Sequence, residues 1–162
     1  MSANGSGVIP SFAWAIIQLG PAVPGTNAIV FAIARYGFAQ NIKVYRVDGV
    51  RGLIEDHFFF ITWSDVAGIC ELSGSVIGSY AKVGSHHISD NNIEQIIANL
   101  KQRKIQALCI IGNTDAYKAV KTLVNYRNRY EELQKIKICY IPISIKPELS
   151  SFECKLGYDS VQ

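Results

Sequence analysis

The chain has 162 residues, of which 49% are hydrophobic and 18% charged. This composition suits one domain with a packed core and excludes a disordered chain. Its net charge of only +3 comes from scattered basic residues, which argues against nucleic acid as a partner. The longest apolar stretch, residues 28–39, is far below the about 20 residues of a membrane span, so we expect a soluble protein.

Cysteine and histidine spacing gives no metal-binding pattern. The four cysteines lack CxxC spacing: Cys70, Cys109, Cys139 and Cys154. Two of them lie in runs that read as buried strands, where free cysteine behaves as a small hydrophobe. His86 and His87 are adjacent, with no partner at helical spacing. We expect a reduced, cytoplasmic setting and no structural metal.

Residues 1–10 are small and polar and predict a disordered segment, which leaves residues 11–162 as the domain. An apolar strand is predicted over Phe12–Leu19. A loop with Gly20 and Gly25 follows, and Thr26 is a candidate cap for a helix that ends near Gly37. Alternating apolar residues over Ile42–Val47 predict the next strand, with a turn at Asp48-Gly49 beyond it.

The middle of the chain has weaker patterns. Phe58–Ile61 is a candidate strand, and the glycines and serines of residues 73–79 indicate loops. Periodicity returns with an apolar stripe at i, i+3, i+4 and i+7, which predicts an amphipathic helix with Asn91 as its N-cap. The stripe consists of Ile93, Ile96, Ile97 and Leu100.

The last third of the chain continues the alternation. Ala107–Ile111 is an unbroken apolar run typical of a strand covered on both faces, and Ile136–Ile141 predicts a further buried strand. A helix is predicted between them from Thr114 to Glu132. Its expected inner face contains Ala116, Ala119, Val120, Leu123 and Val124. Strands that alternate with helices predict an α/β fold with a doubly wound, Rossmann-like parallel sheet.

Three loops follow carboxyl ends of predicted strands and should therefore converge on one crevice. They span residues 20–25, 112–115 and 142–148. A glycine loop at a helix N-terminus commonly holds phosphate through backbone N–H groups. The candidate phosphate or nucleotide residues are Gly20, Gly25, Gly112, Asn113, Thr114 and Asp115.

A series of short segments carries a more specific signal. They are Pro24-Gly-Thr-Asn-Ala28, Val47-Asp-Gly-Val-Arg-Gly-Leu53, Trp63–Gly68, Gly74–Ser79, Ile105–Gly112, Tyr126–Leu133 and Leu156–Ser160. In this order and at compatible spacing, they resemble segments of the phosphofructokinase family. The resemblance covers about residues 12–162 and implies the fold of that family, truncated before its second lobe.

Animal-type members of this family carry a catalytic half and a related regulatory half. Ala116-Tyr117 and the run from Arg129 to Leu133 resemble the N-terminal part of the regulatory, C-terminal half. The resemblance implies glycolytic phosphorylation of fructose 6-phosphate by ATP in the intact enzyme. It also implies that the intact enzyme uses ATP and magnesium. This chain by itself should require neither of them.

The departures from the catalytic pattern support that assignment. Gly20-Pro21-Ala22 stands where catalytic copies read Gly-Gly-Asp, and proline has no N–H to offer a phosphate. Thr114 stands where catalytic copies have the carboxylate for magnesium. Lys146 stands at the position of the catalytic base, and its ammonium has no lone pair to accept a proton. The sequence therefore predicts no catalytic residue and no metal ligand.

Ser144 and Lys146 remain candidate contacts for a fructose phosphate effector or substrate. A solvated loop lysine is an equal interpretation of Lys146. The expected partners are a catalytic half and further subunits of a homo-oligomer. Two other functions stay open: an active sugar-phosphate kinase that uses Asp115 or Glu148 for the metal, and an unrelated Rossmann-like sensor of small ligands.

Overall fold

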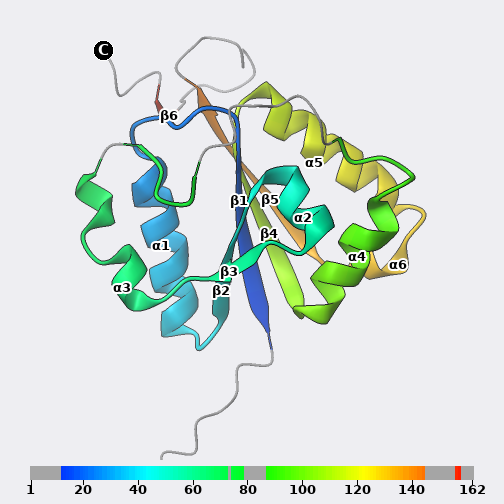
Figure 1. The fold of residues 1–162 in the computed structure, drawn as a ribbon, viewed down its shortest axis with the longest axis horizontal. Coiled ribbons are helices and arrows are strands. Elements are labelled where there is room, and N and C mark those ends of the chain that lie inside the picture. Colours follow the sequence, from blue (N-terminus) through cyan, green and yellow to red (C-terminus); the bar gives the residue numbers. More distant parts are fainter. Residues whose placement is uncertain (1–11, 73, 79–86, 145–155, 158–162) are drawn as a thin grey trace, which may run out of the picture.

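The computed structural model describes residues 12–72, 74–78, 87–144 and 156–157. The strands are β1 (Ala13–Leu19), β2 (Lys43–Val47), β3 (Phe58–Phe60), β4 (Ile105–Gly112), β5 (Lys137–Ser144) and β6 (Leu156–Gly157). The helices are α1 (Thr26–Ala39), α2 (Gly49–Glu55), α3 (Trp63–Val66), the 3-10 helix η1 (Ile69–Glu71), α4 (Ile93–Gln102), α5 (Thr114–Arg127) and α6 (Glu131–Gln134). Figure 1 shows their arrangement.

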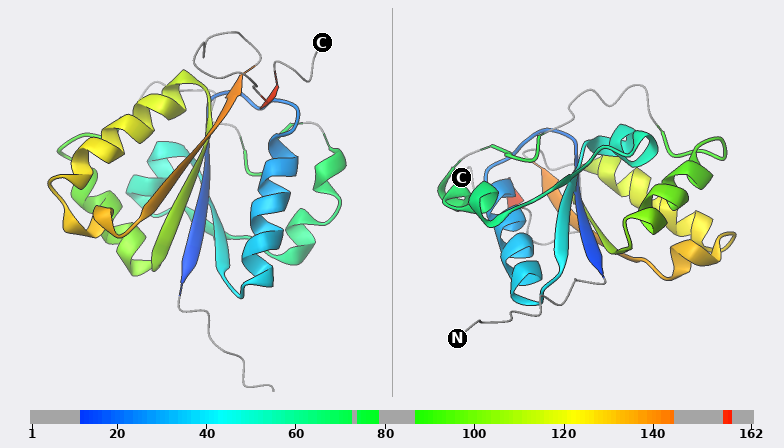
Figure 2. Two further views of the ribbon diagram at one scale, coloured as in Figure 1. Left: turned by 180° about the vertical axis from the view of Figure 1, so that it is seen from behind. Right: turned by 60° about the horizontal axis from the view of Figure 1, so that its bottom comes forward.

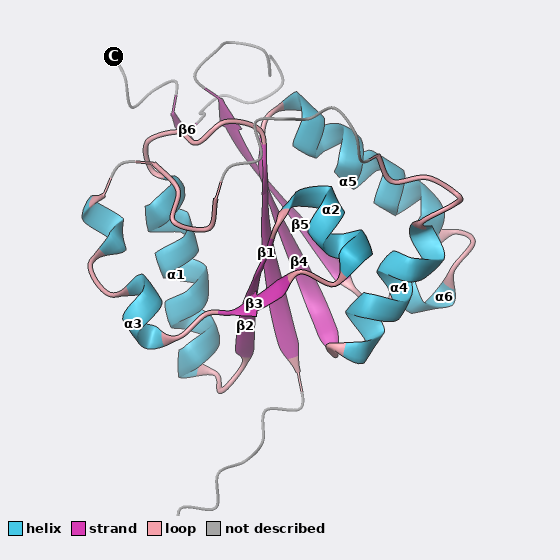
Figure 3. Ribbon diagram, viewed as in Figure 1, coloured by secondary structure: helices cyan, strands magenta, loops and turns pink. Residues whose placement is uncertain are grey.

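The strands form one twisted sheet in the order β3-β2-β1-β4-β5-β6. The four strands predicted from apolar runs pair in parallel, β2 with β1, β1 with β4 and β4 with β5. Helix α1 and α3 lie on one side of this sheet, and α2, α4, α5 and α6 lie on the other (Figures 2 and 3). The predicted doubly wound α/β fold is confirmed, because helical crossovers cover both faces.

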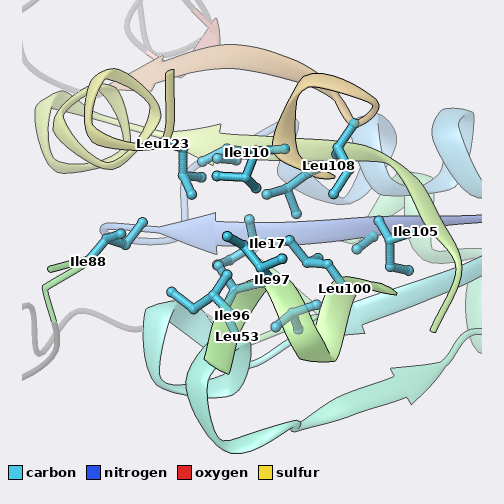
Figure 4. Packing of buried hydrophobic residues seen from close by; sticks show 14 of the residues in the cluster. Ile17, Leu53, Ile88, Ile96, Ile97, Leu100, Ile105, Leu108, Ile110 and Leu123 are labelled. Atoms are coloured by element: carbon cyan, nitrogen blue, oxygen red, sulfur yellow. The ribbon is translucent and has the colours of Figure 1, made fainter. Parts of the chain in front are cut away.

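Each face of the sheet has its own apolar core. Alternate residues of β1 point to opposite sides, so Ile17 joins one core and Ile16 the other. The first core packs α2, α4, α5 and α6 against the sheet, and Figure 4 shows Leu100 of α4 and Leu123 of α5 reaching into it. The predicted stripe of Ile93, Ile96, Ile97 and Leu100 is buried there.

Polar contacts fix α4 against the preceding segment. Buried Asn99 donates from Nδ2 to the carbonyl oxygens of Leu53 and Ile54, both at 2.9 Å. Arg103 and Asp56 form a two-pronged ion pair with N–O distances of 3.0 and 2.7 Å. That hydrogen-bonded carboxylate raises the pKa of Arg103. The first contact provides donors for two backbone carbonyls at the end of α2, and the second neutralises the charge of the Asp56 carboxylate that follows.

Some predicted elements were wrong in detail. The expected turn at Asp48-Gly49 is the start of α2, because residues 49–55 bury Gly49, Gly52 and Leu53. Helix α4 has Asn92 rather than Asn91 as its N-cap. The candidate strand at Phe58–Ile61 is confirmed as β3 over Phe58–Phe60, and as the edge strand of the sheet it pairs antiparallel with β2.

Two helices also differ from expectation. Thr26 is the first residue of α1 rather than its cap, and its hydroxyl donates to the Val23 carbonyl at 2.8 Å. The long helix predicted from Thr114 to Glu132 is divided into α5 and α6. Of its predicted inner face, Val124 is 43% exposed, because the buried stripe of α5 follows Ala116 and Leu123.

Within the described ranges, no helix is both long and apolar enough to cross a bilayer. The predicted disordered segment, residues 1–10, lies outside the described residues.

Candidate functional site

The carboxyl ends of the three central strands lie at one edge of the sheet, as predicted. Leu19 of β1 pairs in register with Gly112 of β4, and Gly112 pairs with Pro142 of β5. The loops that begin at Gly20, Gly112 and Ser144 therefore leave from neighbouring positions. The N-terminus of α5 lies at this edge as well (Figure 1).

Gly112 allows β4 and β1 to approach closely at the edge. A Cβ atom at this position would lie 1.9 Å from the Leu19 carbonyl oxygen and 2.7 Å from Cβ of Ala116. Neither neighbour can yield easily, because one is sheet backbone and the other is the inner face of α5. Glycine is therefore required here by close packing.

Asn113 occupies the position where a phosphate-binding loop would present free backbone N–H groups. It is the N-cap of α5, and its Oδ1 accepts a hydrogen bond from the Asp115 N–H at 3.1 Å. A Cβ atom at Gly20 would lie 2.7 Å from the same Oδ1. The amide of Asn113 thus fills the space between the first and second loops and caps a donor that phosphate would need.

Tyr140 of β5 closes the second loop from the other side. Its hydroxyl donates toward the carbonyl oxygens of Gly112 and Asn113, both at 3.1 Å. Its ring packs against Tyr117 of α5 with centroids 6.1 Å apart. Burial raises the pKa of Tyr140 to about 12, with a smaller contribution from the nearby Tyr117 hydroxyl. The phenol therefore keeps its proton and holds the loop at neutral pH.

We expect Tyr140→Phe to lower the free energy of unfolding by about 1 kcal/mol at pH 7, since it removes the donor to these two carbonyls. Because folding raises the pKa of Tyr140 from 10.0 to about 12, its contribution is complete below pH 10. It is lost as the pH rises through about 12. Urea denaturation at pH 7 and across this alkaline range measures both effects.

Tyr36→Phe, at a residue that is 62% exposed, is the control. The same alkaline loss of stability in wild type and Tyr140→Phe would contradict the assignment.

Thr114 and Asp115 begin α5 directly after the cap. The Asp115 carboxylate pairs with Lys118 at 3.4 Å, one helical turn on. A pocket of about 120 Å³ is lined by Asp115 and Lys118 and also by Leu19, Val50 and His87. This volume is well below the 300–1,000 Å³ usual for small-molecule sites.

The donor set beside this pocket does not fit magnesium. Mg²⁺ is usually held by one or two carboxylates together with phosphates, whereas Asp115 is the one carboxylate among the described residues that line this pocket, and it pairs with Lys118. In the part of the chain that the structure describes, no three His, Cys, Asp or Glu side chains are grouped so that they could hold a metal.

The remaining predicted contacts are placed only in part. Ser144 is the last residue of β5, and its backbone pairs with Gly157 of β6. Lys146 lies outside the described residues. Gly25 precedes α1 as its N-cap, at the start of the helix that follows the first loop. The structure thus brings Gly20, Gly112, Asn113 and Asp115 together.

Two buried amides that the sequence analysis missed hold a further loop at this edge. Gln18 donates to the Pro21 carbonyl at 3.2 Å and accepts a hydrogen bond from the Ser75 hydroxyl. Asn27 donates to the Leu72 carbonyl at 2.9 Å and accepts from the Val76 N–H at 2.8 Å. A polar Gln18 within an apolar strand was the signal that could have revealed this role.

A larger pocket of about 420 Å³ lies away from the predicted loops, between α1, β2, β3 and α3. Arg46 lies along its wall, stacked over Phe59 with 4.4 Å from Cζ to the ring centroid, and pairs with Asp48 at 3.3 Å. The sequence analysis did not predict this pocket, because its walls come from segments distant in the chain.

Comparison with known proteins shows the family to which this chain belongs. The family model described as Phosphofructokinase matches residues 13–162. The chain therefore belongs to the phosphofructokinase family, which confirms the resemblance seen in the short sequence segments.

Among curated relatives, the liver-type ATP-dependent 6-phosphofructokinase of Bos taurus is 35% identical over 151 residues. These residues are 93% of this chain but 19% of that protein, so the chain spans about a fifth of the relative's length. The phosphofructokinase of Pichia pastoris superposes with a TM-score of 0.79 at 26% identity, over 92% of this chain and 16% of that one. The Saccharomyces cerevisiae enzyme has the same fold, with a TM-score of 0.80 at 24% identity over 96% of this chain and 21% of that one.

Proposed function

We propose that this chain is a non-catalytic, regulatory portion of an ATP-dependent 6-phosphofructokinase, which binds a fructose phosphate and transfers no phosphate by itself. The observation that carries the proposal is the closed second loop. Asn113 caps the Asp115 N–H, and Tyr140 holds the carbonyls of Gly112 and Asn113. A loop satisfied by its own side chains offers little to a nucleotide phosphate.

The groups that phosphoryl transfer needs are also replaced. Transfer depends on a positioned base for the sugar hydroxyl and on cations that neutralise the transferred phosphate. At the family's base position this chain has Lys146, and at its metal position Thr114. An ammonium cannot take the hydroxyl proton, and a threonine hydroxyl adds no negative charge for magnesium.

Sugar-phosphate binding survives these replacements. Lysine binds phosphate as a point charge, and a serine hydroxyl can donate to a phosphate oxygen. Ser144 ends β5 at the edge where the loops converge, and Lys146 follows two residues later. In the complete protein, a catalytic half and further subunits would supply ATP and magnesium sites. Glycolysis and the cytoplasm are the expected setting.

The alternative of an active kinase would require Asp115 or Glu148 to hold the metal. The ion pair between Asp115 and Lys118 argues against the first of these. The family membership favours the regulatory function over a sensor unrelated to phosphofructokinases.

Calorimetric titration with fructose 6-phosphate tests the proposed binding. We expect Lys146→Ala to weaken binding about tenfold, since a charge-assisted hydrogen bond contributes about 1.5 kcal/mol or more. Lys137→Ala is the matched control, because this exposed lysine lies at the opposite end of β5 and should leave binding unchanged. No binding by the wild-type chain, or equal losses in both variants, would contradict the proposal.

A further inference from the structure

Two cysteines on neighbouring strands lie directly opposite each other. Cys109 of β4 and Cys139 of β5 are register partners in a parallel pair. Neighbouring strands lie about 4.8 Å apart. A disulfide needs a Cα–Cα separation of roughly 4.4–6.8 Å. Since opposite residues on paired strands point to the same face, the strand pairing places these two residues within the Cα–Cα range of a disulfide.

The two thiols differ in access. Cys109 is partly buried and packs against the core on the α1 side of the sheet, whereas Cys139 is exposed. Burial raises the pKa of the Cys109 thiol to about 11, with further contributions from the charge and hydrogen bonding of the Cys139 thiol. Cys109 therefore stays protonated until a reaction begins beside it, and Cys139 is the sulfur that a reagent in solution can reach.

We propose that Cys109 and Cys139 form a redox modification site at which small disulfides of the glutathione class produce a Cys109–Cys139 disulfide. The Cys139 thiolate attacks one sulfur of the small disulfide, forms a mixed disulfide with it and releases the other sulfur as a thiolate. That thiolate takes up the proton that Cys109 gives up. The Cys109 sulfur then attacks Sγ of Cys139 and displaces the second small thiol. Two protein thiols are oxidised, and one small disulfide is reduced to two thiols.

The bond would tie together the strands that carry the candidate site. Cys109 lies three residues before Gly112, and Cys139 lies three residues before Pro142. Oxidation would fix β4 to β5 just below the loop that Tyr140 closes. It would also close a loop that contains all of α5 and α6, so oxidation should raise the urea concentration at the unfolding midpoint.

The experiment uses the full chain with Cys70→Ser and Cys154→Ser, which leaves only the pair. After incubation with oxidised glutathione, intact mass spectrometry should show the loss of two hydrogen atoms and no glutathione adduct. Peptide mapping should join the peptides that contain Cys109 and Cys139. Adding Cys109→Ala should stop the reaction at a stable glutathione adduct on Cys139, and adding Cys139→Ser should abolish the reaction in the folded protein.

Cys70 is the matched control for exposure, because it is also exposed but lies on η1 instead of a paired strand. A chain that keeps only Cys70 should form the mixed disulfide and go no further. Far-ultraviolet circular dichroism of each variant checks that it is folded. A persistent glutathione adduct on Cys139 of the folded paired variant, with Cys109 still open to alkylation after unfolding, would overturn the proposal. An unmodified pair would overturn it as well.

Discussion

Gly112→Ala should lower the free energy of unfolding by about 3 kcal/mol or more, because the new methyl group would overlap sheet backbone. The Cβ atom would lie 1.9 Å from the Leu19 carbonyl oxygen and 2.7 Å from Cβ of Ala116. Relief requires β4 to move away from β1, which breaks the pairing that brings the candidate loops together. Urea denaturation followed by circular dichroism measures the loss.

The control for Gly112→Ala separates this overlap from the loss of glycine itself. Gly68 has a positive φ of +76°, and no described residue beyond its chain neighbours comes within 4 Å of the place that a Cβ atom would take. Gly68→Ala should therefore lower the free energy of unfolding only by the left-handed backbone strain, about 1 kcal/mol. Equal losses at the two positions would show that close packing at Gly112 is not what requires a glycine there.

Leu100→Ala should destabilise the chain by about 3 kcal/mol, because it removes a fully buried side chain from the core between α4 and the sheet. Leu100 reaches into this core in Figure 4, where Ile17 and Leu108 of the sheet also point. The loss combines the transfer free energy of the removed carbons with the cavity they leave. Chemical denaturation of wild type and variant under the same conditions measures it.

Leu72→Ala is the matched control for this core substitution, since Leu72 is 57% exposed and its contact with Asn27 uses the backbone carbonyl. Its effect should stay within about 0.5 kcal/mol. A loss below about 1 kcal/mol for Leu100→Ala would mean that α4 does not pack as the structure places it.

The sequence predicted most of the sheet because its central strands consist mainly of apolar residues. Ala13–Leu19 and Ile105–Gly112 need cover on both faces, and only parallel strands with helical crossovers provide it. Helix α2 was missed because the glycines in residues 49–55 carry turn signals, although Gly49 and Gly52 are buried in a helix. There, tertiary packing overrides local propensity.

The sequence predicted where the loops of the candidate site lie, but not that side chains of the protein itself close the second loop. Loops after parallel strands meet at one edge, so Gly20 and Gly112 could be placed together from the sequence. The closure of the second loop depends on Tyr140, which lies 28 residues beyond Gly112 in the chain. Nothing in local sequence pattern indicates that a strand tyrosine will donate to these carbonyls, and the buried contacts of Gln18 and Asn27 are equally nonlocal.

The most direct test of the proposed non-catalytic function is a coupled assay of the purified chain with ATP, magnesium and fructose 6-phosphate. A complete ATP-dependent 6-phosphofructokinase serves as the positive control. We predict no formation of ADP that depends on fructose 6-phosphate, because the proposed function assigns Lys146 to the position of the base and Thr114 to that of the metal carboxylate. Turnover by this chain that is abolished by Asp115→Asn or Glu148→Gln would contradict the account and identify an active kinase with a rearranged site.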